Sequence, residues 1–108
     1  MAMSEKSSDF EIINEPEAER YSISVDGELA GFTQYRERPG GLAFVHTEID
    51  DRFEGQGLGS RLISFALDDA RSRGLAVLPF CPFVKSYIQR HSEYVDLVPE
   101  GMRAQFGL

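Results

Sequence analysis

The spacing of apolar residues changes once along this chain, near residue 60, and that change constrains the fold more than any other feature. Before it, apolar and polar residues alternate with a period of two, which indicates strands that bury one face. After it, apolar residues recur at helical spacing and then form a short continuous run. Such a run is typical of a strand that is buried on both faces. The chain therefore predicts several strands followed by a helix, a buried strand and a further segment.

The first half contains four predicted strands joined by short turns. They cover residues 10–15, 20–25, 28–37 and 42–50. Asp26-Gly27, between the second and third strands, tolerates the positive φ angles of a tight hairpin turn. Arg38-Pro39-Gly40-Gly41 provides the next turn. We expect these four strands to form an antiparallel meander.

The second half predicts a helix, a strand and a second helix. The first helix begins at Ser60 and ends near Gly74, with a polar face that includes Asp68 and Asp69. Its apolar face consists of Leu62, Ile63, Ala66, Leu67 and Ala70. A strand follows at 75–80, and Pro82 then suits the first position of a helix over 83–91. A strand–helix–strand connection makes the strands at 42–50 and 75–80 parallel.

These elements predict an α+β fold with a single mixed, mostly antiparallel sheet. The expected order is four strands, a helix, a strand and a helix. The length of 108 residues suits one domain over 1–108, with 1–8 and 99–108 flexible or peripheral. Apolar residues after Ser92, among them Tyr94 and Leu97, are expected to cover the sheet.

Composition excludes several classes of protein. The chain is 42% hydrophobic and has eight Phe and four Tyr, unlike a disordered chain. It has no apolar run near the roughly 20 residues that a membrane-spanning helix needs, and its first residues lack the apolar core of a secretory signal. The single cysteine forbids an intrachain disulfide, so we expect a cytoplasmic protein. Cys and His residues are too few and too scattered for a metal site.

Charge is distributed unevenly along the chain. The net charge is −7, which argues against a nucleic-acid partner. Residues 52–90 nevertheless contain six basic and three acidic residues, a local charge of +3, so the rest of the chain carries −10. Ordinary solvated helix surface explains this pattern. The alternative is an anion site within the basic stretch and a cationic substrate elsewhere.

Three alternate glycines, Gly55, Gly57 and Gly59, join the fourth strand to the first helix. Bare backbone N–H groups followed by a helix N-terminus form a cradle for anions. The loop is not a Walker-type loop, because Ser60-Arg61 stands where Lys-Ser/Thr is required. The third glycine also comes too early for a dinucleotide-binding fingerprint. A merely flexible connector remains the alternative.

The sequence resembles the small cysteine-containing branch of the GNAT-type N-acetyltransferases. The resemblance covers roughly residues 10–98 and is carried by four motifs in order: His46-Thr47-Glu48, Gly55-Gln56-Gly57-Leu58-Gly59-Ser60, Cys81-Pro82-Phe83-Val84 and His91-Ser92-Glu93-Tyr94. It implies a sheet opened into a V, with acetyl-CoA between the fourth and fifth predicted strands and its pyrophosphate on the amides of Gln56 to Ser60. The implied cosubstrate-binding residues are Ile49, Gly55, Gln56, Gly57, Leu58, Gly59, Ser60 and Lys85.

The sequence departs from that family at two places. Glu54 stands where Arg or Gln is usual, so we expect its carboxylate to point away from a pyrophosphate. Larger relatives carry a tyrosine that protonates the departing CoA thiolate. Ile88 takes that position here, and Tyr87 lies one residue away, on a different helix face.

Cys81 and Glu48 are the candidate catalytic side chains. Cys81 begins a helix whose N-terminus favours a thiolate by about 0.3–1 kcal/mol, which alone does not ionise a thiol at neutral pH. The alternative for Cys81 is a small buried apolar residue. Glu48 is either a general base, as in some GNAT enzymes, or a surface carboxylate. His91 lies about 13 Å along the helix from Pro82, too far to serve as the base for Cys81.

The resemblance implies an N-acetyltransferase that uses acetyl-CoA as cosubstrate and no metal. Its acceptor would be an amine, either a small molecule or a lysine of a macromolecule, with neither nucleic acid nor membrane as a partner. Transfer would proceed through acetyl-Cys81 or by direct attack of the amine. The rival interpretation is a non-catalytic module that binds acyl-CoA or another protein.

Overall fold

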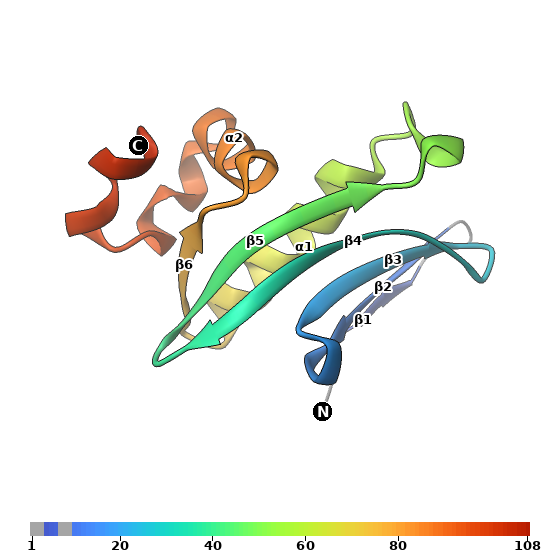
Figure 1. The fold of residues 1–108 in the computed structure, drawn as a ribbon, viewed down its shortest axis with the longest axis horizontal. Coiled ribbons are helices and arrows are strands. Elements are labelled where there is room, and N and C mark those ends of the chain that lie inside the picture. Colours follow the sequence, from blue (N-terminus) through green and yellow to red (C-terminus); the bar gives the residue numbers. More distant parts are fainter. Residues whose placement is uncertain (1–3, 7–9) are drawn as a thin grey trace.

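The protein folds into one twisted sheet with its helices packed beside and behind it (Figure 1). The structure is a computed structural model that describes residues 4–6 and 10–108. In chain order the strands and α-helices are β1 Ser4–Lys6, β2 Phe10–Glu15, β3 Arg20–Val25, β4 Glu28–Arg38, β5 Gly41–Ile49, α1 Leu58–Ser72, β6 Ala76–Pro79 and α2 Pro82–Arg90. Within the described ranges, no helix is both long and apolar enough to cross a membrane.

The sheet has the strand order β1-β2-β3-β4-β5-β6, so every strand pairs with its neighbours in the chain. All these pairs are antiparallel except β5 with β6, which run parallel and are connected by α1. The predicted α+β fold with its mixed sheet is confirmed. The sequence did not predict β1, which pairs with the free edge of β2. The rest of the 1–8 segment, 1–3 and 7–8, lies outside the described residues.

Helix α1 begins at Leu58, two residues before the predicted start. Gly57 is its N-cap with φ +74°, a left-handed backbone conformation that residues with a Cβ rarely adopt. The glycine therefore turns the chain sharply into the helix. As a result, Leu58 and Gly59 belong to the first helical turn, where N–H groups have no partner inside the helix.

The core lies between the sheet and α1. The predicted apolar face of the helix is confirmed, because Leu62, Ile63, Ala66, Leu67 and Ala70 are all fully buried. On the sheet they meet three fully buried rings, Tyr21, Tyr35 and Phe44. The ring centroids of Tyr21 and Tyr35 lie 5.4 Å apart. Burying each large apolar side chain contributes about 1.5–3 kcal/mol, so this layer stabilises the fold more than any surface contact.

Asp69 corrects one sequence expectation. It was placed on the polar face of the first helix, yet only 1% of it is exposed. Three residues after Ala66, it lies on the buried side of the helix, where its Oδ2 accepts a hydrogen bond from the Tyr21 hydroxyl. Arg73 Nε lies 3.3 Å from the same oxygen. Burial first, and the neighbouring Asp69 carboxylate second, raise the pKa of Tyr21 well above its ordinary value.

The C-terminal segment packs against the helices. Arg71 of α1 holds Asp96 through two hydrogen bonds of 2.8 and 2.9 Å. The Tyr94 hydroxyl donates to Asp68 of α1, and the Tyr94 ring lies 6.0 Å from that of Tyr87 of α2. Phe106, inside the segment predicted to be flexible or peripheral, joins the core and is 5% exposed. The reason is that its ring packs edge-on against Phe80 just after β6.

The raised pKa of Tyr21 predicts how stability changes in alkaline solution. The unfolded tyrosine releases its proton near pH 10, whereas the folded one keeps it to higher pH. Stability is therefore fully present below about pH 10 and falls as the pH rises further. We expect the urea midpoint to drop less steeply between pH 9 and 11 in Tyr21→Phe than in the wild type. Equal slopes in the two proteins would contradict this account.

Candidate functional site

The candidate site lies where β5 and β6 separate, an opening that we call the fork. The two strands pair only from Gly41–Ala76 to Phe44–Pro79. Gln34 of β4 then pairs with His46 and Tyr35 with Phe44, so Val45 is an extra residue that makes a bulge in β5. Beyond the bulge β5 continues to Ile49, while β6 ends and the chain turns into α2; Figure 1 shows the two strands diverging. The fork places the N-termini of α1 and α2 near one another.

A hollow of about 260 Å³ lies at the glycine loop, where α1 begins. It contains six of the eight predicted cosubstrate-binding residues and three further ones. The lining is Ile49, Phe53, Glu54, Gly55, Gly57, Leu58, Gly59, Ser60 and Phe83. Gln56 and Lys85 were predicted to bind there but are not part of the lining. Glu54 is exposed and belongs to the lining of this hollow, so it lies close to the predicted pyrophosphate position, and the expectation that its carboxylate points away stays a prediction.

Phe83 is a lining residue that the sequence analysis missed. It belongs to the first turn of α2, and its ring stands against Gly59. A Cβ on Gly59 would lie 2.6 Å from Phe83 Cζ, so a side chain at residue 59 would displace the Phe83 ring. Phe83 remains 39% exposed because one side of its ring faces the hollow. An exposed position in a helical period carried no signal that could have revealed this contact.

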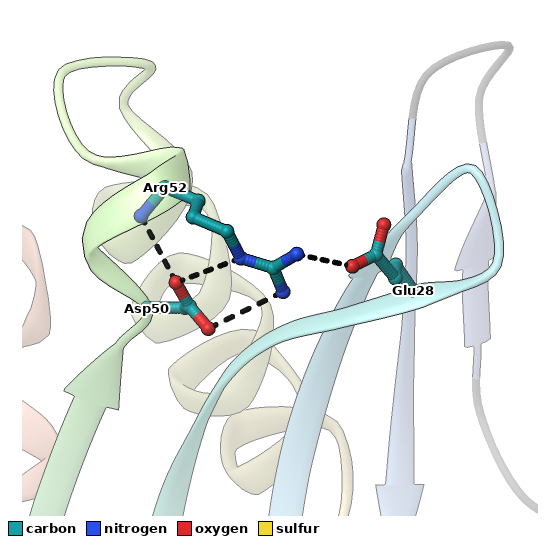
Figure 2. Close-up of polar contacts among 3 residues, drawn as sticks. All are labelled: Glu28, Asp50 and Arg52. Atoms are coloured by element: carbon teal, nitrogen blue, oxygen red, sulfur yellow. Dashed lines mark hydrogen bonds and ion pairs between the residues drawn. The ribbon is translucent and has the colours of Figure 1, made fainter.

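Arg52 ties the start of the glycine loop to the hairpin between β3 and β4 (Figure 2). Its guanidinium donates to Glu28 Oε2 at 2.6 Å and to Asp50 Oδ1 at 3.2 Å. Asp50 Oδ1 also accepts from the Arg52 backbone N–H at 2.9 Å. These hydrogen bonds, the backbone one foremost, hold the pKa of Asp50 below its ordinary value. Arg52 therefore organises the loop and is not a free cation.

The local charge of +3 is reduced by such pairing. Besides Arg52, Arg71 is held by Asp96 and Arg73 by Asp69. Among the residues that the structure describes, Arg61, Lys85 and Arg90 have no carboxylate within ion-pair distance. The Arg61 guanidinium lies 5.0 Å from the centroid of the Phe10 ring, just past the glycine loop. The cations that remain for an anion are thus fewer than the sequence count indicates.

Cys81 is buried at the start of α2 and is 3% exposed. Its backbone N–H donates to the Phe44 carbonyl at 2.8 Å, which holds it in the fork. As the N-cap of α2 it makes no side-chain hydrogen bond to the first helical turn. Instead its Sγ lies 3.3 Å from Thr47 Oγ1 of β5. Thr47 lies within a motif that resembles the family, yet the sequence predicted no role for it, because a threonine within a strand is ordinary.

Glu48 and Cys81 are on opposite faces of β5. Thr47, which contacts Cys81, pairs with Thr33, whereas Glu48 pairs with Phe32, and neighbouring residues of a strand point to opposite faces. Glu48 Oε1 lies 3.3 Å from His46 Nε2, so these two side chains share a face, as expected. His91 stacks on Tyr87 at the end of α2, with 4.1 Å between ring centroids.

A second hollow of about 160 Å³ lies beside β4 and β5. Its lining is Leu29, Ala30, Gly31, Phe32, Glu48, Ile49 and Asp50. It therefore combines apolar side chains with two carboxylates and shares Ile49 with the glycine-loop hollow. Across the described ranges of the chain, no three His, Cys, Asp or Glu side chains gather in a way that could hold a metal ion.

A family model described as GCN5-related N-acetyltransferase matches residues 20–97, more than half of the chain. The chain belongs to the GNAT family. The match begins in β3 and ends after α2, so it includes the fork, the glycine loop and Cys81. No curated protein sequence matches the chain.

Solved structures share the GNAT fold with this chain. A GCN5-like protein from Staphylococcus aureus, solved in solution by NMR, has a TM-score of 0.58 and 19% identity over 90% of this chain and 87% of that one. Ard1 from Thermoplasma volcanium has a TM-score of 0.50 and 24% identity over 59% of this chain and 44% of the Ard1 chain. N-acetylglutamate synthase from Neisseria gonorrhoeae, complexed with coenzyme A and N-acetyl-glutamate, has a TM-score of 0.50 and 19% identity. That match covers 82% of this chain and 22% of the synthase chain.

The close approach of Gly59 and Phe83 predicts that the effect of Gly59→Ala on the free energy of unfolding depends on whether the Phe83 ring is present. Gly→Ala inside a helix is stabilising by about 0.5–1 kcal/mol when space exists. Here the added Cβ meets the Phe83 ring, so Gly59→Ala should lose that gain or destabilise the wild type. In a Phe83→Ala background the same change should stabilise the protein. Urea unfolding of the four proteins measures the coupling, and an equal effect of Gly59→Ala in both backgrounds would contradict the contact.

Proposed function

We propose that this GNAT protein transfers an acetyl group from acetyl-CoA to an amine, and that Cys81 carries the group between them. The observation that carries the proposal is the fork, which brings the glycine-loop hollow and the Cys81 thiol to the same end of β5. In acetyl-CoA the pantetheine arm joins the pyrophosphate to the thioester, so covalent transfer needs a pyrophosphate site and a nucleophile that the thioester can reach. The solved complex of N-acetylglutamate synthase with coenzyme A supports this use of the fold.

The residues of the hollow fit a pyrophosphate. Its glycines leave backbone N–H groups bare, and the first turn of α1 adds N–H groups that have no partner within the helix. A Cβ on Gly55 or Gly57 would meet no atom within 4 Å, so the space beside the backbone is open. Ile49 and Phe83 form apolar walls for the rest of the cosubstrate.

Transfer through Cys81 balances in two steps. In the first, Cys81 Sγ bonds to the acetyl carbonyl carbon, the bond from that carbon to the CoA sulfur breaks, and the Cys81 proton passes to CoA. One thioester replaces another, so the step is nearly balanced in energy. In the second, the amine nitrogen bonds to the same carbon, the bond to Sγ breaks, and an amine proton returns to Cys81. This route needs no tyrosine at the position of Ile88.

The acceptor is proposed to be a cationic amine in solution, either a small molecule or a protein lysine. The second hollow supports this class, because the Glu48 carboxylate would attract an ammonium and Leu29 and Phe32 would pack against an aliphatic stem. The Asp50 carboxylate in the same lining is already paired with Arg52. Because Glu48 lies on the other face of β5 from Cys81, it is the candidate base for the alternative route, in which the amine attacks acetyl-CoA directly. The net charge of −7 favours the same class of acceptor.

Replacing Gly57 tests the pyrophosphate site. Gly57→Glu and Gly57→Gln suffer the same backbone strain at φ +74° and add similar bulk, but only the former adds a negative charge. We expect Gly57→Glu to bind CoA at least about tenfold more weakly than Gly57→Gln, a difference of ~1.4 kcal/mol. Isothermal titration calorimetry gives both affinities. Equal affinities would show that no phosphate lies beside residue 57.

Incubation with acetyl-CoA and no acceptor tests the covalent step. One acetyl mass should appear, should map to Cys81, and should be absent from Cys81→Ala. Cys81→Ser should keep CoA binding and lose most turnover. If Cys81→Ala kept near-normal turnover with a genuine acceptor, the amine would attack acetyl-CoA directly. Turnover with any amine also separates the enzyme from a non-catalytic acyl-CoA-binding module, which would bind acetyl-CoA without releasing CoA.

A further inference from the structure

We propose that Thr47, supported by Thr33, is a positioning residue for the Cys81 thiol. This inference rests on the proposed role of Cys81 and adds a pair of hydroxyl groups to it. Cys81 Sγ lies 3.3 Å from Thr47 Oγ1, which in turn lies 2.8 Å from Thr33 Oγ1. Thus three side chains from β4, β5 and the start of α2 form one hydrogen-bonded line.

The line can carry its hydrogen bonds in either direction, because a hydroxyl both donates and accepts. Thr33 is fully buried, and within the described part of the chain its hydroxyl has Thr47 as its side-chain partner. While Cys81 is a thiol, its S–H can donate to Thr47 Oγ1, and once the proton has left the sulfur, the Thr47 hydroxyl can turn and donate to Sγ. In that second arrangement Thr33 donates to Thr47, so the sulfur that attacks faces a hydroxyl donor held in place by Thr33.

A fixed donor matters because a cysteine side chain has three staggered rotamers to choose from. The contact with Thr47 selects the rotamer that points from the start of α2 toward β5. The same donor stays in contact as negative charge grows on sulfur during the attack, and hydrogen bonds to charged groups are stronger than those between neutral groups. Thr47 therefore both aims the sulfur and supports its reactive form.

The bulge in β5 determines the face of the sheet on which Thr47 lies. Without the extra residue at Val45, the alternation along β5 would turn the side chain of residue 47 to the other face. With the bulge, Thr47 shares its face with Thr33 and with Cys81, while Glu48 turns to the face of the second hollow. The bulge thus divides the two predicted catalytic side chains between the two faces of the sheet.

The test compares Thr47→Val, which keeps the shape and removes the hydroxyl, with Thr47→Ser, which keeps the hydroxyl and removes the methyl. We expect Thr47→Val to slow acetylation of Cys81 by acetyl-CoA at least about tenfold. Thr47→Ser should restore most of the rate, and Thr33→Val should give an intermediate loss. Affinity for CoA should be unchanged in all three variants, since none of these residues lines the glycine-loop hollow.

Alkylation by iodoacetamide gives a second measurement that does not depend on acetyl transfer. Cys81 is the single cysteine of the chain, so one added mass reports its reactivity in the native protein. If the wild type is never acetylated, the proposed function fails, yet slower alkylation of Thr47→Val than of Thr47→Ser would still support the positioning role. If the two variants react alike, or Thr47→Val reacts like the wild type, the hydroxyl has no such role. Thermal unfolding of each variant verifies that it is folded.

Discussion

The early end of pairing between β5 and β6 is the constraint on which the site depends. Four residues of β5 pair with β6, and then the bulge at Val45 sends the rest of β5 away from its neighbour. A sheet that stayed paired to its edge would fill this space with backbone. Because it opens, the glycine-loop hollow at the start of α1 and the thiol at the start of α2 both lie beside the second half of β5. The fully buried rings of Tyr21, Tyr35 and Phe44 pack between the sheet and α1 and fasten the two together.

Ion pairing neutralises much of the local positive charge that the sequence shows between residues 52 and 90. Three of the six basic side chains between residues 52 and 90 are paired with carboxylates. Arg52 pairs with two carboxylates, those of Glu28 and Asp50, and so links the start of the glycine loop to the β3–β4 hairpin. A surface ion pair of this kind is worth about 0–1 kcal/mol, so its effect is on the conformation of the loop more than on stability. The proposed anion site in the hollow would therefore depend chiefly on backbone N–H groups, which no side-chain ion pair neutralises.

Much of the fold follows from local patterns. The period of two identified β2 to β5, helical spacing identified α1, and the strand–helix–strand order required that β5 and β6 be parallel. Local patterns failed where the partner was distant in the chain. The charge of Asp69 predicts a place on the polar face of the helix. In the structure Asp69 is buried, because the hydroxyl of Tyr21, 48 residues away in the chain, donates a hydrogen bond to its carboxylate. Phe106 and β1 likewise owe their places to Phe80 and to the edge of β2.

The sequence by itself determined that three glycines precede a helix and that a cysteine precedes the next one. Both are local facts, because turn geometry and helix starts depend on adjacent residues. Only the tertiary structure decided that Phe83 packs on Gly59, that Cys81 meets Thr47, and that Glu48 faces the other way. These contacts depend on the register between strands and on one extra residue in β5. A shift of a single residue reverses every side chain beyond it, and no local pattern of charge or hydrophobicity records where that shift occurs.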